Sequence, residues 1–392
     1  MSDFENMRIT LHGVQGSGST SLRLAERESS REVAEVRLLE QFFQDLLARF
    51  GKGASIACTV EELLEGPFNK ETLRKFRNRY SGEPPVSYGG LTTCIQVETA
   101  DGQDLVFDCG SGFRNCAIAL QKKWADRSER QVHIFGSHSH RDHTEGFDQA
   151  PVCFDPRNEI HIYGNRQFLF ALDDQLGIFS RSVDADQLGV HTPLYYAMMP
   201  AEFACHPIVI GNQTVDGLLP EVAGASFAVE ETIVLGETRV TPFELFHPAP
   251  CLGYSVQTGG KKFVFATDHE LRRGDDDSGA DEISQAAEDR LRRHGQGADV
   301  LYRDGQYMLA EYLGDKGIGD SPPLPRIDWG HSCFEDVVAM AEECNVCHTL
   351  VGHHDPNREW AERQWMDTAM NRNSEDGLRR IELAKAETVI CL

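Results

Sequence analysis

The sequence has few basic residues for its size. Its 392 residues include 38 lysines and arginines against 62 aspartates and glutamates, which gives a formal net charge of −24. Nucleic-acid phosphates need a basic surface, so this balance argues against general nucleic-acid binding. It argues less strongly against a single local basic groove.

Long apolar runs are also missing. No run is long enough to span a membrane, and the first ten residues, MSDFENMRIT, lack the apolar core of a signal peptide. The eleven cysteines are odd in number and follow no paired framework, which is typical of free thiols in a reducing compartment. We therefore expect a cytoplasmic protein without a membrane segment.

Histidine, in contrast, is concentrated in one short segment. Residues 138–143 read HSHRDH and follow an apolar run that predicts a strand. His138 and His140 point to the same side of an extended chain, because side chains alternate along a strand. Asp142 and His143 follow where the chain turns, so they can face a second metal. Imidazoles and carboxylates at this density suit zinc, manganese or iron.

Further candidate ligands follow predicted strands downstream. They are His247 after 243–246, Asp268 after 262–266, and His353 with His354 after 349–352. This recurrence argues against the simpler interpretation of HSHRDH as a polar turn that happens to be rich in histidine. Predicted strands and helices interleave throughout the chain, which indicates an α/β layered fold.

Residues 20 to about 80 differ from the rest of the chain in their sequence pattern. Apolar side chains recur there at helical spacing, namely at Val36, Leu39, Phe43, Leu46 and Phe50. The pattern predicts a helical insert of two or three helices within a single domain that covers residues 1–392. Its apolar stripe is better explained by core or dimer contacts than by catalysis.

Two glycine-containing segments have more than one interpretation. Asp108, in the sequence FDCGSG, either orients a neighbouring ligand histidine or only caps the next helix. The loop at residues 13–18 either approaches an anion closely or forms a plain turn, and the plain turn is the preferred interpretation.

These motifs together resemble the metallo-β-lactamase superfamily. Asp108, HSHRDH, His247, Asp268 in FATDHE and His353 in LVGHHDP occur in the order of that family's five motifs. The resemblance covers nearly all of residues 7–392. It implies a four-layer αβ/βα sandwich with two metals at one edge of the facing sheets.

A closer likeness is to the phosphodiesterase branch related to ribonuclease Z, which includes anti-Pycsar-like hydrolases of cyclic nucleotides. YGGLTTC at 88–94, YRDGQY at 302–307 and WGHSCFED at 329–336 carry this likeness. True β-lactamases of this fold lack the bridging aspartate, so Asp268 argues against a lactamase. The glyoxalase branch lacks the GHS segment. The helical insert departs from the compact members of the branch.

The resemblance implies two divalent metal ions per chain, with zinc expected first and manganese or iron as alternatives. The ligands of one ion would be His138, His140 and His247. The ligands of the other would be Asp142, His143 and His353, and Asp268 would bridge the two ions. His354 is the alternative to His353, which we prefer because it comes first after its strand.

The resemblance also implies a catalytic set. It comprises Asp142, His331 as the general acid, and Asp304 as the residue that orients His331 or a metal-bound water. A histidine suits this task because its pKa lies near neutrality. The alternative for His331 is a structural residue beside Ser332 at the start of a helix.

Three functions follow from these expectations. The first is hydrolysis of a small phosphodiester, with a cyclic nucleotide as the leading candidate, by a hydroxide that two metals activate. The second is a ribonuclease Z-like endonuclease, which would need a basic arm that we do not find between His143 and His247. The third is a non-catalytic metal-binding or nucleotide-sensing protein. We also expect a homodimer, because related phosphodiesterases are commonly dimers.

Overall fold

The computed structural model describes most of the chain in two compact units. The described residues are 5–20, 35, 38, 41–48, 56–80, 88–184, 186, 192–211, 224–273, 281–370 and 379–392. One unit is Ser21–Ser87, and the other combines Met1–Thr20 with Tyr88–Leu392. Among the described residues, no helix has both the length and the apolar character needed to cross a membrane.

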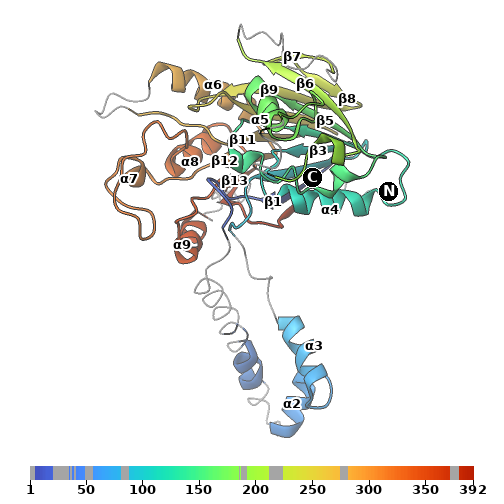
Figure 1. The fold of residues 1–392 in the computed structure, drawn as a ribbon. Coiled ribbons are helices and arrows are strands. Elements are labelled where there is room, and N and C mark those ends of the chain that lie inside the picture. The colour runs from blue at the N-terminus through green and yellow to red at the C-terminus, as the bar shows by residue number, and fades with distance from the viewer. Residues whose placement is uncertain are drawn as a thin grey trace. The chain divides into compact units, whose positions relative to one another are not determined.

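The larger unit is built on two mixed sheets (Figure 1). The first sheet has, in spatial order, β15 (Val389–Cys391), β1 (Met7–Gly13), β2 (Cys94–Thr99), β3 (Asp104–Phe107), β4 (Gln131–Phe135), β5 (Glu159–Gly164), β6 (Glu202–Val209) and β7 (Phe227–Ala228). The second has β14 (Arg380–Leu383), β13 (His348–Gly352), β12 (Val300–Asp304), β11 (Lys261–Ala266), β10 (Cys251–Thr258), β9 (Thr238–Leu245) and β8 (Ile233–Leu235).

Parallel pairing places several strand ends at one edge of each sheet. Strands β3 to β6 run parallel to one another in the first sheet. Strands β11 to β14 do so in the second. Loops at the carboxyl ends of parallel strands are where α/β folds usually carry their sites.

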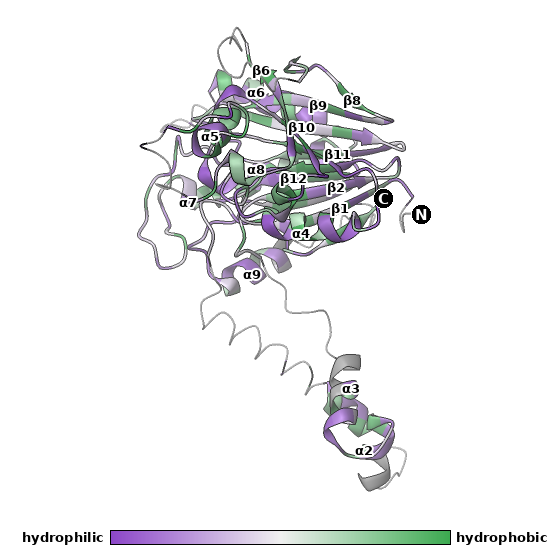
Figure 2. Cartoon of the chain, turned by 45° about the vertical axis from the view of Figure 1, so that its right-hand side comes forward, coloured by the Kyte–Doolittle hydropathy of each residue, from purple (hydrophilic) through white to green (hydrophobic). Residues whose placement is uncertain are grey.

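The two sheets pack face to face over an apolar core. Phe107, Phe135, Tyr254, Phe265 and Tyr302 are fully buried in it. The rings of Phe107 and Phe135 stack with centroids 5.5 Å apart, and Phe265 and Tyr302 do the same at 5.5 Å. The central strands of the larger unit carry many hydrophobic residues (Figure 2).

Helices cover the outer face of each sheet. Helices α4 (Phe113–Lys123) and α5 (Arg166–Leu176) pack on the first sheet. Helices α6 (Glu282–Gly295) and α8 (Phe334–Glu343) pack on the second. This arrangement confirms the predicted αβ/βα sandwich. Among its described residues, this unit also contains α7 (Leu309–Tyr312) and α9 (Trp360–Met370).

The smaller unit contains helices in the segment where the sequence predicts them. They include α2 (Ile56–Leu64) and α3 (Lys70–Tyr80), and Asn69 caps α3 by accepting the backbone N–H groups of Glu71 and Thr72. Leu63, Leu64 and Phe76 are buried together. Of the predicted stripe, Leu46 packs against them and Phe43 is 54% exposed. Val36, Leu39 and Phe50 lie outside the described residues.

Candidate metal centre

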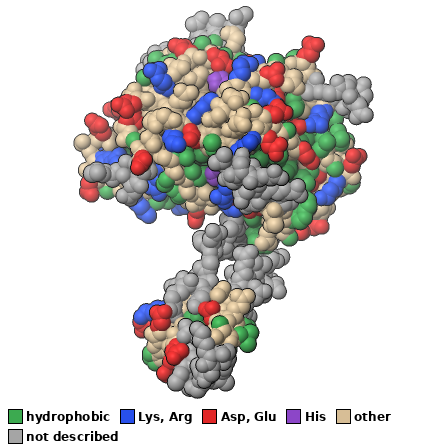
Figure 3. Space-filling model, turned by 180° about the vertical axis from the view of Figure 1, so that it is seen from behind, with side chains coloured by type: hydrophobic (Ala, Val, Ile, Leu, Met, Phe, Trp, Pro, Cys, Tyr) green, Lys and Arg blue, Asp and Glu red, His purple; other side chains and the backbone are tan. Residues whose placement is uncertain are grey.

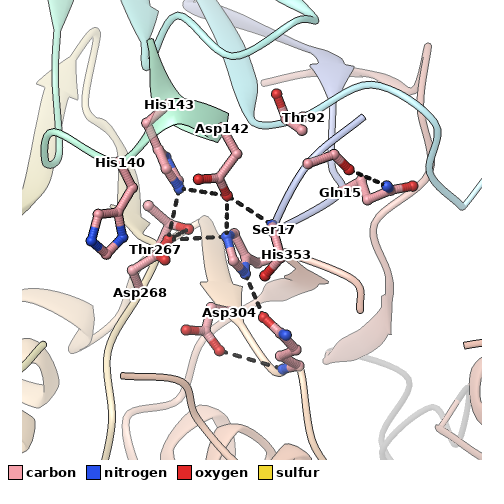
Figure 4. A network of polar contacts seen from close by, with 12 residues as sticks. Gln15, Ser17, Thr92, His140, Asp142, His143, Thr267, Asp268, Asp304 and His353 are labelled. Atoms are coloured by element: carbon pink, nitrogen blue, oxygen red, sulfur yellow. Dashed lines mark hydrogen bonds and ion pairs between the residues drawn. The ribbon is translucent and has the colours of Figure 1, made fainter. Parts of the chain in front are cut away.

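The predicted ligands come from loops that follow separate strands and meet at one edge of the sandwich. His138 and His140 follow β4, and Asp142 and His143 lie in a short 3₁₀ turn, Arg141–His143. The others follow β9, β11 and β13 and are His247, Asp268 and His353. Figure 4 shows Asp142, His143, Asp268 and His353 pointing toward one another.

The side chains form two clusters. The first cluster is His138, His140 and His247, whose candidate ligand atoms lie within 4.8 Å of one another. The second cluster is Asp142, His143 and His353, which meets the same limit. In the second cluster, Asp142 Oδ2 is 3.3 Å from Nε2 of both histidines. Each cluster therefore presents three ligand atoms to a common point.

Asp268 lies between the two clusters with one oxygen toward each. Its Oδ1 is 3.8 Å from Nε2 of His138 and of His247. Its Oδ2 is 3.3 Å from Nε2 of His143 and of His353. A carboxylate in this position can contact a metal ion in each cluster at once.

The donor atoms fit metal ions chemically. Nε2 of His138 and Nε2 of His143 are buried and have no hydrogen-bond partner among the described residues. A buried polar atom without a partner is costly, and a metal ion would satisfy it. Imidazole nitrogens and carboxylate oxygens in sets of three or four are typical zinc ligands.

The pKa values of the histidines differ between the two clusters, and both patterns fit the binding of a cation. Burial lowers the pKa of His138 well below its usual range, and burial lowers that of His247 to about 4, so both rings are neutral and ready to bind. Burial opposes protonation of His143, but the charges of Asp142 and Asp268 raise its pKa well above the usual range. A metal ion would replace that proton.

Hydrogen bonds from outside the clusters fix the orientation of the histidines. Asp108 Oδ2 accepts a hydrogen bond from His143 Nδ1 at 2.7 Å, and Asp108 is itself held by the N–H and hydroxyl of Ser137. Bonding at Nδ1 leaves Nε2 free for a metal. The structure therefore supports the orienting role of Asp108. Gly112, and not Asp108, precedes α4 as its cap.

Gln306 orients the imidazole of His353, the other histidine of the second cluster. Its Oε1 lies 2.9 Å from His353 Nδ1. His354 turns elsewhere, because its Nε2 lies 2.8 Å from the carbonyl oxygen of Ala384. Of the two adjacent histidines, His353 is the one that joins the cluster.

Sharp backbone turns direct three of these side chains to the edge. Asp108, Asp268 and His353 have φ of 61°, 55° and 56°, in the left-handed region that non-glycine residues seldom adopt. Each comes just after a strand ends. Such local strain is often found at functional sites.

His331 lies beside both clusters, and Asp304 lies next to His331 and His353. His331 Nδ1 is 3.3 Å from Asp304 Oδ2 and 3.6 Å from Asp268 Oδ1, and its ring stacks on that of His353. Burial lowers the pKa of His331, but the hydrogen bond to Asp304 and the charge of Asp268 outweigh burial and raise it to about 9. The residue before α8 is Cys333, so His331 lies ahead of the helix cap.

Asp304 is held by its surroundings. It accepts backbone N–H groups from Ser332 at 2.9 Å and His269 at 3.1 Å. The structure thus brings together every site residue that the sequence predicts.

A family comparison agrees with this geometry. Residues 103–354 match the model of the beta-lactamase superfamily domain. The chain belongs to the metallo-β-lactamase superfamily. Members of this superfamily are mostly metal-dependent hydrolases. No curated protein matches the sequence significantly.

Solved structures show the same metallo-β-lactamase fold. Human tRNase Z, short form, is 15% identical, with 98% of each chain covered and a TM-score of 0.50. Zinc-bound PqqB from Methylobacterium extorquens is 11% identical, with 98% of this chain and 100% of that chain covered and a TM-score of 0.51. At these identities the likeness establishes the fold.

Sequence reasoning missed several polar contacts of this metallo-β-lactamase site. Besides Gln306, they include the Thr267 hydroxyl, which donates to Asp268 Oδ2 at 2.5 Å, and Ser17, whose N–H donates to Asp142 Oδ2 at 2.8 Å. Thr267 precedes Asp268 directly, so its position was a usable signal. Ser17 lies 125 residues from Asp142, and no local pattern links them.

Proposed function

We propose that the protein is a metal-dependent phosphodiesterase that acts on a small phosphodiester, with a cyclic nucleotide as the leading candidate substrate. The observation that carries the proposal is the position of Asp268, with one oxygen toward each of two ligand clusters. His331, which lies beside Asp268 and contacts Asp304, adds a proton donor. Superfamily membership supports hydrolysis, and we infer the phosphodiester substrate class in addition.

Each of the two ligand sets would hold one metal ion. His138, His140 and His247 would hold one ion, and Asp142, His143 and His353 the other, with Asp268 shared. Two divalent ions bound there would supply an activated water and would neutralise charge on a phosphoryl group. Zinc suits these ligands best, and manganese or iron are alternatives.

His331 would protonate the leaving oxygen. Asp304 accepts a hydrogen bond from Nδ1 of His331, which leaves Nε2 of that ring to carry the transferable proton. The raised pKa keeps this ring protonated at neutral pH, and bound cations would lower the pKa from that value because like charges repel. Asp304 acts through His331 by orienting its ring.

A small substrate is favoured over RNA by the charge of the molecule. The formal net charge is −24, and on the face seen in Figure 3 lysine and arginine side chains are scattered among acidic ones. An endonuclease would need a continuous basic surface to hold an RNA backbone. A non-catalytic sensor is less well supported, because both ligand clusters are complete.

The proposal is tested by assaying the purified, metal-loaded protein against a panel of cyclic nucleotides, a linear bis-phosphodiester and a precursor transfer RNA. We expect turnover of at least one small phosphodiester and none of the transfer RNA. The Asp268→Ala variant is the matched control for contaminating activity. Cleavage of transfer RNA alone would favour the endonuclease, and no turnover of any substrate would favour the sensor.

We propose a single catalytic domain with a helical insert at about 20–80, working as a homodimer in the cytoplasm. The exposed Phe43 and Leu47, at 54% and 68% exposure, give this insert apolar surface for a partner. Light scattering at micromolar concentrations should give twice the chain mass, and a monomer mass would contradict the dimer.

A further inference from the structure

The glycine-containing loop at residues 13–18, which follows β1, contacts the metal centre. The sequence favours a plain turn here. We propose instead that Gly16 and Ser17 are positioning residues for the second cluster, and that they set its affinity for metal separately from the first cluster. This inference rests on the two-metal site of the proposed function and is independent of the substrate.

Ser17 fixes the carboxylate of the second cluster. Its backbone N–H donates to Asp142 Oδ2 at 2.8 Å, shown in Figure 4. The same oxygen faces Nε2 of His143 and of His353 at 3.3 Å. An N–H group bound to this oxygen restricts rotation of the carboxylate, so the oxygen stays aimed at the common point of the cluster.

Gly16 lies against the imidazole of His353. A Cβ atom added to Gly16 would come within 2.2 Å of Cε1 and Nδ1 of that ring. Only glycine allows so close an approach. The N–H of Gly16 also donates to the carbonyl oxygen of His354 at 3.0 Å, which ties the loop to the strand end that carries the ligand.

The loop is anchored independently of any metal. The N–H groups of Val14 and Gln15 both donate to the Leu91 carbonyl at 3.1 Å. Beyond the glycines, the Ser19 hydroxyl lies 2.6 Å from Glu145 Oε1 and 2.7 Å from Ser111 Oγ. A loop held at both ends can keep Gly16 and Ser17 in place before a metal binds.

The contacts are selective for one cluster. Within the part of the chain that the structure describes, hydrogen bonds of this loop reach Asp142 and the His354 backbone. None reaches His138, His140 or His247. A change in the loop should therefore weaken one metal position and leave the other unchanged.

The test is metal binding by the full-length Gly16→Ala variant. After equilibration in zinc buffers, the wild type should hold about two zinc ions per chain and the variant about one. Contacts that orient metal ligands typically change affinity by about 10–100-fold, so the dissociation constant of the second cluster should rise by that factor. Cobalt absorption spectra would show whether the position with carboxylate and two imidazoles is the one lost.

Ser17→Gly is the matched control. Ser17 has φ of 57°, which glycine adopts freely, and glycine keeps the N–H that binds Asp142. This variant should hold two zinc ions with wild-type affinity. Loss of one ion in Ser17→Gly would contradict the role given to the backbone N–H.

Failure of this inference can be told from failure of the proposed function. If the wild type binds fewer than two ions, the two-metal site of the proposed function is contradicted. A wild type and a Gly16→Ala variant that bind two ions equally well would overturn this inference alone.

If metal-free Gly16→Ala melts well below the wild type, Ser19→Ala replaces it. That variant loses only hydroxyl contacts to Glu145 and Ser111. The dissociation constant of the second position should then rise by about 3- to 10-fold, as expected for loss of a hydrogen bond. An unchanged constant would overturn the inference.

Discussion

The two ligand clusters share one aspartate but differ in the ligands that they offer and in exposure. The first consists of three imidazoles, and His140 among them is exposed. The second contains a carboxylate and two fully buried histidines. Surrounding polar groups contact Nδ1 atoms in both, such as Ser137 Oγ at 3.0 Å from His138 and Asp108 Oδ2 at 2.7 Å from His143. The comparison teaches that one sheet edge can build a cation site either from imidazoles alone or from imidazoles with a carboxylate.

This difference predicts unequal affinities. A charged carboxylate favours a cation more than a neutral imidazole does. We therefore expect the second cluster to hold its ion more tightly than the first.

The largest effect is expected from Asp268→Ala, which removes the group common to both clusters. Metal content should fall below one ion per chain. Turnover should fall about 1000-fold or more, since a catalytic metal contributes several kcal/mol to transition-state stabilisation. Elemental analysis together with the phosphodiesterase assay checks this. Retention of two ions would show that Asp268 does not bridge.

His331→Ala should separate chemistry from metal binding. Turnover on the natural substrate should fall by about 10²–10⁴-fold with both ions retained, because general-acid catalysis contributes that much. The loss should shrink for a nitrophenyl phosphodiester, whose leaving oxygen departs without a proton. Equal losses on both substrates would remove His331 from the catalytic set.

The pH profile gives a second check on His331. Its protonated form is the donor, so wild-type turnover should fall as the pH rises through the pKa of His331. The structure raises that pKa above its ordinary value despite burial, through Asp304 and Asp268. His331→Ala should lose this alkaline fall. Asp304→Asn should move it to lower pH, because a charge that raises the pKa is gone.

Asp108→Asn should weaken the second cluster, which Asp108 contacts directly, more than the first, which it reaches only through Ser137 and His138. An amide cannot accept from His143 Nδ1 with the strength of a carboxylate, so the affinity of the second cluster should fall by about 10–100-fold. The first cluster is the internal control. Zinc titrations followed by calorimetry would resolve the two constants, and equal weakening of both would contradict the separation between the clusters.

The smallest effect concerns a histidine group away from the centre. Burial, with the nearby His161 and His206, lowers the pKa of His133 to about 3. Below pH 6.5 the unfolded chain binds a proton there that the folded protein does not, so the free energy of unfolding should fall as the pH falls. The slope is at most about 1.4 kcal/mol per pH unit.

His133→Gln removes this titration. Urea unfolding between pH 4 and 6 should show a shallower dependence on pH than the wild type. Identical slopes would mean that His133 takes up its proton in the folded state. The outcome shows how burial alone changes the pKa of an imidazole, apart from the carboxylates that raise histidine pKa values at the metal centre.

Short-range signals in the sequence predict the α/β layering and the candidate ligands, whereas the four-layer sandwich and the division into two ligand sets follow from the family resemblance. Alternating apolar strands that each end in histidine or aspartate place those residues at one sheet edge, as His138 and Asp268 show. Contacts such as Ser17 with Asp142 could not be predicted, because their partners are distant in the chain. The position of His353 directly after its strand predicts the right ligand of the two adjacent histidines, but no sequence signal marks the left-handed backbone at this residue.

The central claim is a centre of two metal ions that share Asp268. Anomalous scattering from crystals of the zinc-loaded protein tests it most directly. The account predicts two peaks, one among His138, His140 and His247 and one among Asp142, His143 and His353, with an oxygen of Asp268 coordinated to each. A single peak, or no peak near Asp268 after soaking with zinc, would contradict the claim.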